Sequence, residues 1–487
     1  MFRRPTKKQL FIRRIITYVV MVLAVIVIVA GTILFILGYR VDSDKGRIEQ
    51  GALIQFDSQP NGANVAIDGN SINANTPSKQ TVVAGQHSFV VNRANYEPWS
   101  KTLNVKAGTL EWLDYIRLVP KNLKVESVGS YATVFGEKAS PDYKWLLVQQ
   151  KADTPSFQLV DLRSQQVKSS TIVLPASVYS DASTAGVAHT FVMESWDKDG
   201  RHVILKHSFN DKSEYIVVDT QDVATSVNIS SLLNISLTEV EFSGTSGNIF
   251  YGVTDGVIRK LDLSNATISR GLVTNVKSFE MFETNIISYV GINPANPAQQ
   301  VAGVYREGDE SPHVLRVVKD LTTPLTIAAT RYYSDDFVAI SEGLKVTVLK
   351  GRYPSSSETD NSSLKQYAEF KAAANIDTTS FSETGSRLIV QSGLTFVGYE
   401  IEYKRATNAS IATTETTPHT LKWLDDAYVW AVYDGHLSIR EFDGANTHVI
   451  MSMEPGFDAT LSQNGKYLYG ISKTGDTYHL QRVTLIL

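Results

Sequence analysis

Seven aspartates are the side chains in this sequence best suited to acid and base chemistry, because several of them stand in pairs. They are Asp142, Asp197, Asp199, Asp335, Asp336, Asp425 and Asp426. Two neighbouring carboxylates serve as acid and base in glycoside hydrolases. Each of these aspartates, however, stands in a run of turn-forming residues, where Asp accepts hydrogen bonds from nearby backbone amides. We therefore predict that they stabilise turns.

The sequence contains no other catalytic or metal-binding signature. The string DKDG at 197–200 is similar to the start of a calcium loop but lacks the later oxygen ligands and the final Glu. The nine His have no zinc-binding spacing, there is no Cys, and no Gly-x-Ser-x-Gly motif occurs. The sequence therefore assigns no catalytic, cofactor-binding or metal-binding residue and implies no cofactor.

An uncharged apolar stretch at 15–37, IITYVVMVLAVIVIVAGTILFIL, decides where the rest of the chain lies. As a helix it would be about 34 Å long, enough to cross a hydrocarbon core of about 30 Å. Six Lys and Arg precede it, and the first acidic residue is Asp42. Because such cations stay cytoplasmic, we expect a basic tail at 1–14, a signal anchor at 15–38 and everything later outside the plasma membrane.

Two alternatives compete with a membrane anchor for this stretch. A cleaved signal peptide would have an apolar core of about 7 to 15 residues and a small-residue cleavage site at its end. Here the apolar run continues past Ala30 and Gly31, and no Ala-x-Ala pattern follows. A buried core helix is the second alternative, and the preceding cations argue against it.

The charge of the remaining chain excludes one class of partner. The protein has 46 Lys and Arg against 50 Asp and Glu, a net charge of −4, and six of the basic residues lie in the first 14 positions. The rest therefore carries 40 basic and 50 acidic residues, which disfavours nucleic acid because its phosphates need neutralising cations. The lack of Cys fits a prokaryotic envelope protein.

A polar linker at 39–50 leads to a module at 51–120 made of short alternating runs such as ALIQFDS, ANVAIDG and HSFVVNRA. Apolar and polar residues alternate, and Gly, Asn and Pro interrupt the runs, which predicts half-buried antiparallel strands with tight turns.

The same module resembles the PEGA domain family. The resemblance rests on SQPNGANVAIDG, on VVAGQHSFVV and on VKAGTLEWLDYIRL, although Asn61 stands where Glu is usual. It implies a small β-sandwich that binds or acts as a spacer and is not an enzyme. The motif residues are expected to form structural turns: Pro60, Gly62, Ala63, Asp68, Gly69, Thr76, Pro77 and Gly85. Asp68 is expected to cap a turn and not to bind a ligand.

One pattern recurs through residues 121–487: an aromatic or small residue, Ser or Asp, a turn with Gly, a basic residue and an apolar strand. We call the turn in this pattern the marker turn. Clear copies lie at 139–148, 196–205, 381–390 and 461–470, and weaker ones start at Phe242, Phe282, Tyr333 and Trp423. Repeats of about 40 to 50 residues with several short strands are typical of propeller blades.

The marker turn resembles the Ser-Pro-Asp-Gly-Lys turn of TolB-type and other WD40-like propellers. The eight starts favour eight blades, with seven as the alternative and a pair of β-sandwiches as the competing architecture. Residues 123–129, LKVESVG, could add the outermost strand to the last blade and close the ring. Trp at strand or marker positions is expected to pack between blades, and the run 353–365 to form an exposed loop.

These features together predict an all-β protein of the cell envelope with one membrane span. We expect a binding or scaffold protein, not an enzyme, whose propeller face binds an envelope protein or polysaccharide. The alternative is an envelope glycan hydrolase or lyase. A cluster of carboxylates in the central funnel of the propeller, and not in the outer turns, would favour that alternative.

Overall fold

The computed structural model describes residues 7–36, 39–42, 47–244, 246–355 and 363–487. The start of the basic tail, parts of the linker at 37–38 and 43–46, and most of the expected loop at 353–365 lie outside the described residues. The chain divides into two compact units, residues 1–122 and 123–485. Each is described by itself.

Helix α1 runs from Lys7 to Ile36 and thus begins within the basic tail. Its apolar segment Phe11–Leu34 has a mean hydropathy of 2.7, and the side chains along it are exposed. This exposure excludes the core-helix alternative. The helix is long and apolar enough to cross a membrane as an anchor or as a signal sequence. After it, β1 (Tyr39–Asp42) pairs with β2 (Arg47–Gln50).

The rest of the first unit is a sandwich of two sheets, with strand orders β6-β3-β9 and β5-β4-β7-β8. Its strands are β3 (Ala52–Gln59), β4 (Asn64–Ile67), β5 (Asn70–Asn75), β6 (Ser78–Val82), β7 (Gly85–Asn92), β8 (Trp99–Val105) and β9 (Leu110–Arg117). Alternate side chains of β3 and β7, including Phe56 and Phe89, fill the core between the sheets.

The prediction of antiparallel strands is wrong for one pair in this sandwich. Strand β3 runs parallel to β9. These are the first and last strands of the sandwich, so no tight turn joins them and the antiparallel rule for hairpins does not apply. Strand β5 was also missed, because its sequence NSINAN has little apolar character.

The described residues of the second unit form eight four-stranded sheets, seven of which use four consecutive strands. The first four are β11 (Gly136–Ala139), β12 (Trp145–Gln149), β13 (Ser156–Asp161), β14 (Lys168–Val173); β15 (His189–Trp196), β16 (His202–Phe209), β17 (Lys212–Asp219), β18 (Val227–Asn228); β19 (Glu239–Phe242), β20 (Ile249–Thr254), β21 (Val257–Asp262), β22 (Thr267–Ile268); and β23 (Val276–Phe282), β24 (Ile286–Ile292), β25 (Gln300–Arg306), β26 (His313–Val318).

The next three sheets are β27 (Leu325–Tyr332), β28 (Asp335–Glu342), β29 (Lys345–Gly351), β30 (Leu364–Lys371); β31 (Thr378–Phe381), β32 (Arg387–Ser392), β33 (Thr395–Glu400), β34 (Arg405–Ser410); and β35 (Lys422–Trp423), β36 (Tyr428–Tyr433), β37 (His436–Glu441), β38 (His448–Ser452). Short helices η1 (Val223–Thr225) and α2 (Ile229–Leu233) lie near β18. In all eight sheets the marker turn joins the first strand to the second.

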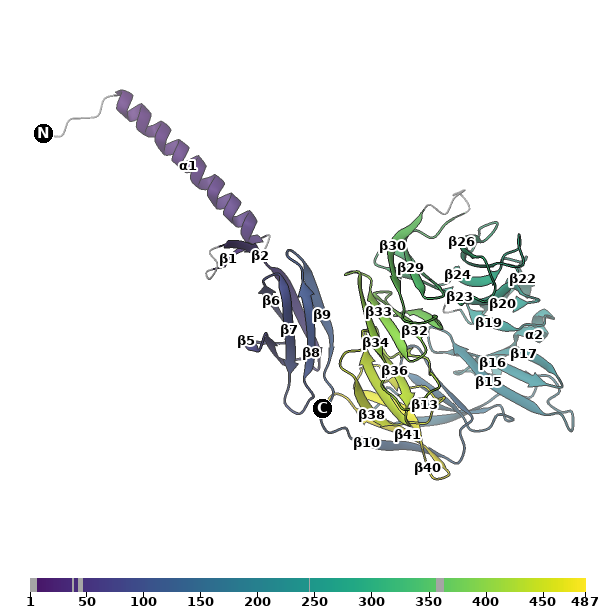
Figure 1. Cartoon of the computed structure of the whole chain (residues 1–487). Coiled ribbons are helices and arrows are strands. Elements are labelled where there is room, and N and C mark those ends of the chain that lie inside the picture. The colour runs from purple at the N-terminus through teal and green to yellow at the C-terminus, as the bar shows by residue number, and fades with distance from the viewer. Residues whose placement is uncertain (1–6, 37–38, 43–46, 245, 356–362) are drawn as a thin grey trace. The chain divides into compact units, whose positions relative to one another are not determined.

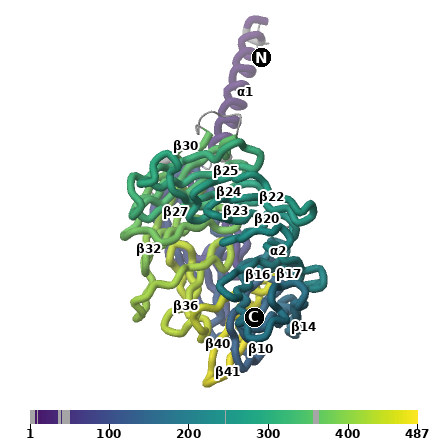
Figure 2. Tube along the Cα trace, turned by 90° about the vertical axis from the view of Figure 1, so that its right-hand side faces the viewer, coloured from purple at the N-terminus to yellow at the C-terminus, as the bar shows by residue number. Residues whose placement is uncertain are grey.

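The eighth sheet closes the ring as predicted. It holds β39 (Thr460–Leu461), β40 (Tyr467–Thr474) and β41 (Thr477–Thr484), and β10 (Val125–Tyr131) pairs with β41 as its outermost strand. Figures 1 and 2 show the sheets following one another around the unit until β40 and β41, in yellow, meet β10. This is a β-propeller closed by strands from both ends of the unit.

The first strands lie innermost in the ring. Strand β11 contacts β15, β19 contacts β23, and β27 contacts both β23 and β31. Apolar clusters fill the spaces between sheets, as where Leu147 and Phe157 of the first sheet pack with Val203 and Leu205 of the second. The first strands therefore bring residues from distant parts of the sequence close together.

Candidate functional site

The marker turns hold most of the aspartates singled out in the sequence. Asp142 accepts hydrogen bonds from Ser140 Oγ at 2.6 Å and from the Lys144 amide at 3.2 Å. Asp425 likewise accepts the amides of Ala427 and Tyr428. These are the contacts of turn-capping aspartates.

Buried aspartates of this group are also satisfied by protein partners. Asp336 binds the Arg331 guanidinium at 2.7 Å and accepts the Tyr353 amide at 2.8 Å. Its neighbour Asp335 is paired with Lys350 at 3.0 Å. Asp199 is exposed in its turn.

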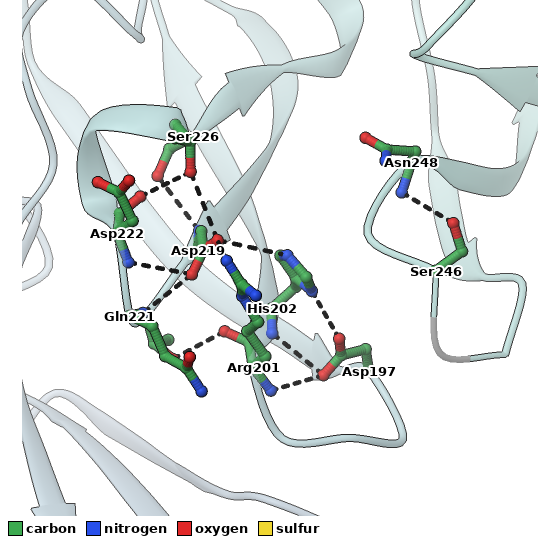
Figure 3. A network of polar contacts seen from close by, with 11 residues as sticks. Asp197, Arg201, His202, Asp219, Gln221, Asp222, Ser226, Ser246 and Asn248 are labelled. Atoms are coloured by element: carbon green, nitrogen blue, oxygen red, sulfur yellow. Dashed lines mark hydrogen bonds and ion pairs between the residues drawn. The ribbon is translucent and has the colours of Figure 1, made fainter.

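The string at 197–200 forms a network with the end of β17, which Figure 3 shows. Asp197 accepts the amides of Arg201 and His202 and lies 2.6 Å from His202 Nδ1. Asp219 accepts from the Arg201 guanidinium at 2.6 Å and from the Gln221 amide at 2.9 Å. Although burial raises the pKa of Asp219, the hydrogen bonds from Arg201 and backbone amides hold it below its ordinary value. Both oxygens of the Asp197 carboxylate have hydrogen-bond partners within the protein, which is typical of an aspartate that caps a turn.

Contacts between marker turns join neighbouring sheets. Ser243 Oγ of the third sheet donates to the Thr284 carbonyl of the fourth at 2.8 Å, and the Thr384 amide of the sixth donates to Asp426 of the seventh at 3.0 Å. A Cβ atom on Gly200 would lie 2.7 Å from the Asp142 carboxylate. The repeated residues therefore hold sheets together.

A different set of acids lies on the innermost strands and was not singled out in the sequence. We call Glu194 of β15, Glu239 and Glu241 of β19, and Glu280 of β23 the first-strand carboxylates. Glu194 is the extra residue of a β-bulge, since the β15 register steps from Met193 to Ser195. A bulge redirects a side chain and is frequent beside functional sites.

The first-strand carboxylates are close enough to repel one another. Burial, followed by the charges of Glu280, Glu239 and Glu194, raises the pKa of Glu241 to about 7, against a smaller opposing effect of Lys138. Burial and then Glu194 raise the pKa of Glu239, and burial raises that of Glu280. Glu241 is therefore only partly ionised at neutral pH.

A further acid occupies the first strand of the first sheet. Glu137 is 8% exposed and accepts the Asp458 amide through Oε1, while Oε2 has no hydrogen-bond partner. Burial, followed by the charge of Asp458, raises the pKa of Glu137 well above its ordinary value. Lys422 pairs with Asp458 and partly offsets the negative charge.

The first-strand carboxylates and Glu137 can transfer protons or bind a cationic group. No group of three or more His, Asp or Glu side chains within the described ranges is arranged to hold a metal ion. No local pattern in the sequence marks these residues, because Glu194 and Glu280 are single acids and the alternation of Glu239 and Glu241 in EVEF is that of any half-buried strand. The bulge and the convergence of three sheets, which create the repulsion, are long-range features.

The PEGA-motif residues lie in turns or in the core of the sandwich. Gly62 and Gly69 have positive φ angles of 82° and 80°, Gly85 has a φ of 144°, and Ala63 is fully buried. The peptide bonds before Pro60 and Pro77 are cis. Thr76 Oγ1 lies 2.5 Å from Ser58 Oγ and accepts the Ala63 amide at 3.1 Å, so it links two of these turns.

Asp68 has a positive φ of 51° in the two-residue turn between β4 and β5. Its carboxylate accepts the Ser88 amide at 2.9 Å and lies 2.7 Å from His87 Nδ1. The Ser88 amide, followed by His87, lowers the pKa of Asp68. Both partners come from β7, so Asp68 ties its turn to the neighbouring strand.

Two of the tryptophans make polar contacts between sheets. Trp196 Nε1 donates to the Lys138 carbonyl at 3.1 Å, which links the second sheet to the first. Trp423 Nε1 donates to Ser380 Oγ, also at 3.1 Å, which links the seventh sheet to the sixth. Both contacts agree with packing between blades.

Comparison with known proteins identifies the first module. Residues 52–122 match the family model of the PEGA domain. The class of protein is therefore a PEGA domain joined to a β-propeller, with one N-terminal apolar helix. A search of curated proteins finds no match to the sequence.

Solved structures similar to this chain are β-propellers. Kluyveromyces lactis Hsv2 is 14% identical, with a TM-score of 0.39 over 72% of this chain and 97% of that one. An oligogalacturonate lyase in complex with manganese is 10% identical, with a TM-score of 0.41 over 73% and 98%. The Cps50 (Swd1) β-propeller domain of Myceliophteria thermophila is 13% identical, with a TM-score of 0.38 over 75% and 99%. These likenesses carry no functional argument.

Proposed function

We propose that the chain is a membrane-anchored binding or scaffold protein of the cell envelope, whose propeller binds a protein or a surface polysaccharide. Residues 1–14 would be cytoplasmic, 15–38 would span the plasma membrane as an uncleaved anchor, and 39–50 would link the span to the outside. The PEGA-like spacer at 51–120 and the propeller at 121–487 would then be extracytoplasmic. The basic tail and the long apolar run support this orientation.

The first-strand carboxylates are the observation that carries the binding proposal. Four acids with one nearby Lys leave an excess of negative charge, and burial, followed by the repulsion among these acids, raises the pKa of Glu241 to about 7. A cationic group from a partner, such as a Lys or Arg side chain or the amino group of a sugar, would relieve that repulsion. Binding should therefore release protons and tighten as the pH rises through about 7.

The test uses the full-length protein in detergent micelles, incubated with fractionated envelope material of the host. The wild type is expected to retain one component, more at pH 8 than at pH 5.5. A Glu241→Gln/Glu280→Gln double variant is expected to lose that retention, while Glu383→Gln, which removes an exposed charge from a marker turn, keeps it. Equal retention by the double variant would refute a role for these acids.

A glycan hydrolase or lyase is the second candidate. The place of the first-strand carboxylates on the innermost strands, and not in the outer turns, favours it, and so does the pKa of Glu241. A carboxyl group with a pKa near 7 suits a general acid, and a second carboxylate close by is the usual companion in glycosidases. The same incubations distinguish the two candidates by mass spectrometry. A polysaccharide returned shortened by the wild type and intact by Glu241→Gln would establish the enzyme; intact material in both would support binding alone.

A further inference from the structure

Tyr333 occupies a backbone position that the other two-residue hairpin loops of this unit give to other residue types. Tyr143 of the first marker turn also has a positive φ, of 59°, but its hydroxyl donates to the Leu424 carbonyl at 3.3 Å. Tyr333 is the first residue of the two-residue loop between β27 and β28 and has a φ of +52°. The described residues of the second unit form six other two-residue hairpin loops, and all have a positive φ at the first position. Those first residues are Asn210, Asp255, Gly343, Gly393, Asp434 and Gly475.

The folded state gains little from a tyrosine in this loop. A bulky side chain disfavours the left-handed region, which Gly, Asn and Asp tolerate. Tyr333 is 82% exposed, so burial of its ring does not offset that cost. A residue that strains a turn without packing into the core points to a role outside folding.

The exposed ring is nevertheless held in one position. The Tyr332 and Tyr333 rings are 4.5 Å apart and tilted by 51° to each other. The Tyr332 hydroxyl donates to Glu402, in the turn after β33, at 2.7 Å. The Tyr332 ring, held by this hydrogen bond, supports the Tyr333 ring while leaving it open to solvent. Pre-ordering of this kind lowers the entropy cost of binding.

Four charged groups that contact Tyr332, Tyr367 or one another carry no net charge. Lys350 pairs with Asp335 at 3.0 Å, and Lys404 Nζ lies 4.0 Å above the ring of Tyr367. With Glu402, this makes two acids and two lysines. A strongly charged ligand would find no net attraction here, whereas the hydroxyl groups of a neutral sugar would find both donors and acceptors.

We propose that Tyr333 is the stacking platform of a second binding site, and that its ligand is a neutral pyranose unit of a polysaccharide. The apolar C–H face of the sugar packs on the ring of Tyr333. Glu402 accepts hydrogen bonds from its hydroxyl groups, and Lys404 donates to them. This site rests on the proposed function, for which it names a polysaccharide as ligand, but it does not rest on the first-strand carboxylates, because its residues lie on other sheets and need no property of those acids. The failure of one of these two sites in its test therefore leaves the other standing.

The test measures saccharide binding by the full-length protein in detergent micelles. The probes are maltohexaose, cellohexaose, chitohexaose and the purified neutral polysaccharide of the host envelope, each titrated calorimetrically. At least one probe is expected to bind, and Tyr333→Gly is expected to weaken that binding about tenfold or more. Tyr332→Phe, which removes the hydrogen bond that ties the neighbouring ring to Glu402, is expected to weaken it less. Leu344→Ala is the matched control, since Leu344 is exposed in the next hairpin loop of the same sheet.

Stability measurements make the same variant informative about folding. Because Gly suits a positive φ, Tyr333→Gly is expected to keep or slightly raise the melting temperature while it loses the saccharide. A fall of several degrees would show a structural role and overturn the proposal. So would binding unchanged in Tyr333→Gly, or no binding by any of the four probes. If Tyr333→Gly loses a bound envelope protein and no saccharide, the ligand of this site is a protein and not a sugar.

Discussion

Glu241→Gln should stabilise the propeller, and by an amount that grows with pH. In the unfolded chain Glu241 titrates near its ordinary value of 4.5, and in the folded protein its pKa is raised to about 7. A raised carboxyl pKa means that the folded state favours the protonated form. Glu241 therefore costs the folded state no stability below pH 4.5. The cost grows as the pH rises from 4.5 to about 7 and is constant above that range.

The shift from 4.5 to about 7 sets the magnitude. At 1.36 kcal/mol for each unit of pKa, the ionised group costs the folded state about 3 kcal/mol at pH 8 and about 1 kcal/mol at pH 5. Glutamine keeps the shape and has no charge to bury. The variant should therefore exceed the wild type in unfolding free energy by these amounts.

The assay is urea unfolding of the full-length protein and the variant in detergent micelles at pH 5 and pH 8. Other titrating groups are common to both proteins, so the difference between the two unfolding free energies isolates Glu241. Glu383→Gln is the control, and no change is expected from it. A gain that is the same at both pH values, or a loss at pH 8, would refute the repulsion argued here for the first-strand carboxylates.

Three further changes test the fold and the topology. Glu214→Gln should destabilise the protein, the opposite of Glu241→Gln. Burial raises the pKa of Glu214, but hydrogen bonds from His207 and Ser180 outweigh burial and lower the pKa to about 2. In urea unfolding the variant should therefore lose about 3 kcal/mol of unfolding free energy at pH 7 and about 1 kcal/mol at pH 3. An equal loss at both pH values would contradict this. Gly200→Ala should lower the melting temperature, with a cost of about 1 to 2 kcal/mol, because the new Cβ would lie 2.7 Å from Asp142 at a φ of +66°. Gly186→Ala, with a positive φ but no atom within 4 Å, is the control and should lose less. Deletion of residues 1–38 should move the protein from the membrane to the soluble fraction, and protease added to intact cells should digest the propeller; protection of the propeller would show that the orientation is wrong.

The fold was predictable from sequence where local chemistry repeats. The four clear marker turns share a capping oxygen, and three of them have a Gly with a positive φ, so their letters recur and reveal the sheets one after another. The closing role of β10 followed from ring geometry. The parallel pairing of β3 with β9 was not predictable in this way, because no letter in either strand specifies a partner at the other end of the module.

The candidate sites escaped prediction for a related physical reason. Residues that hold neighbouring sheets together must be similar in each sheet, because the contact is the same at each interface. A binding group is needed once, so the repeat does not mark it. Glu241 stands within β19, and Tyr333 stands in a marker turn where four other copies have a Gly with a positive φ. The repeat signal therefore marks the scaffold, and departures from it mark the places to search for function. The two kinds of departure differ in how they can be found. Tyr333 breaks a local backbone preference and is detectable one loop at a time, whereas the pKa of Glu241 depends on side chains of three sheets and becomes visible only when the ring is closed.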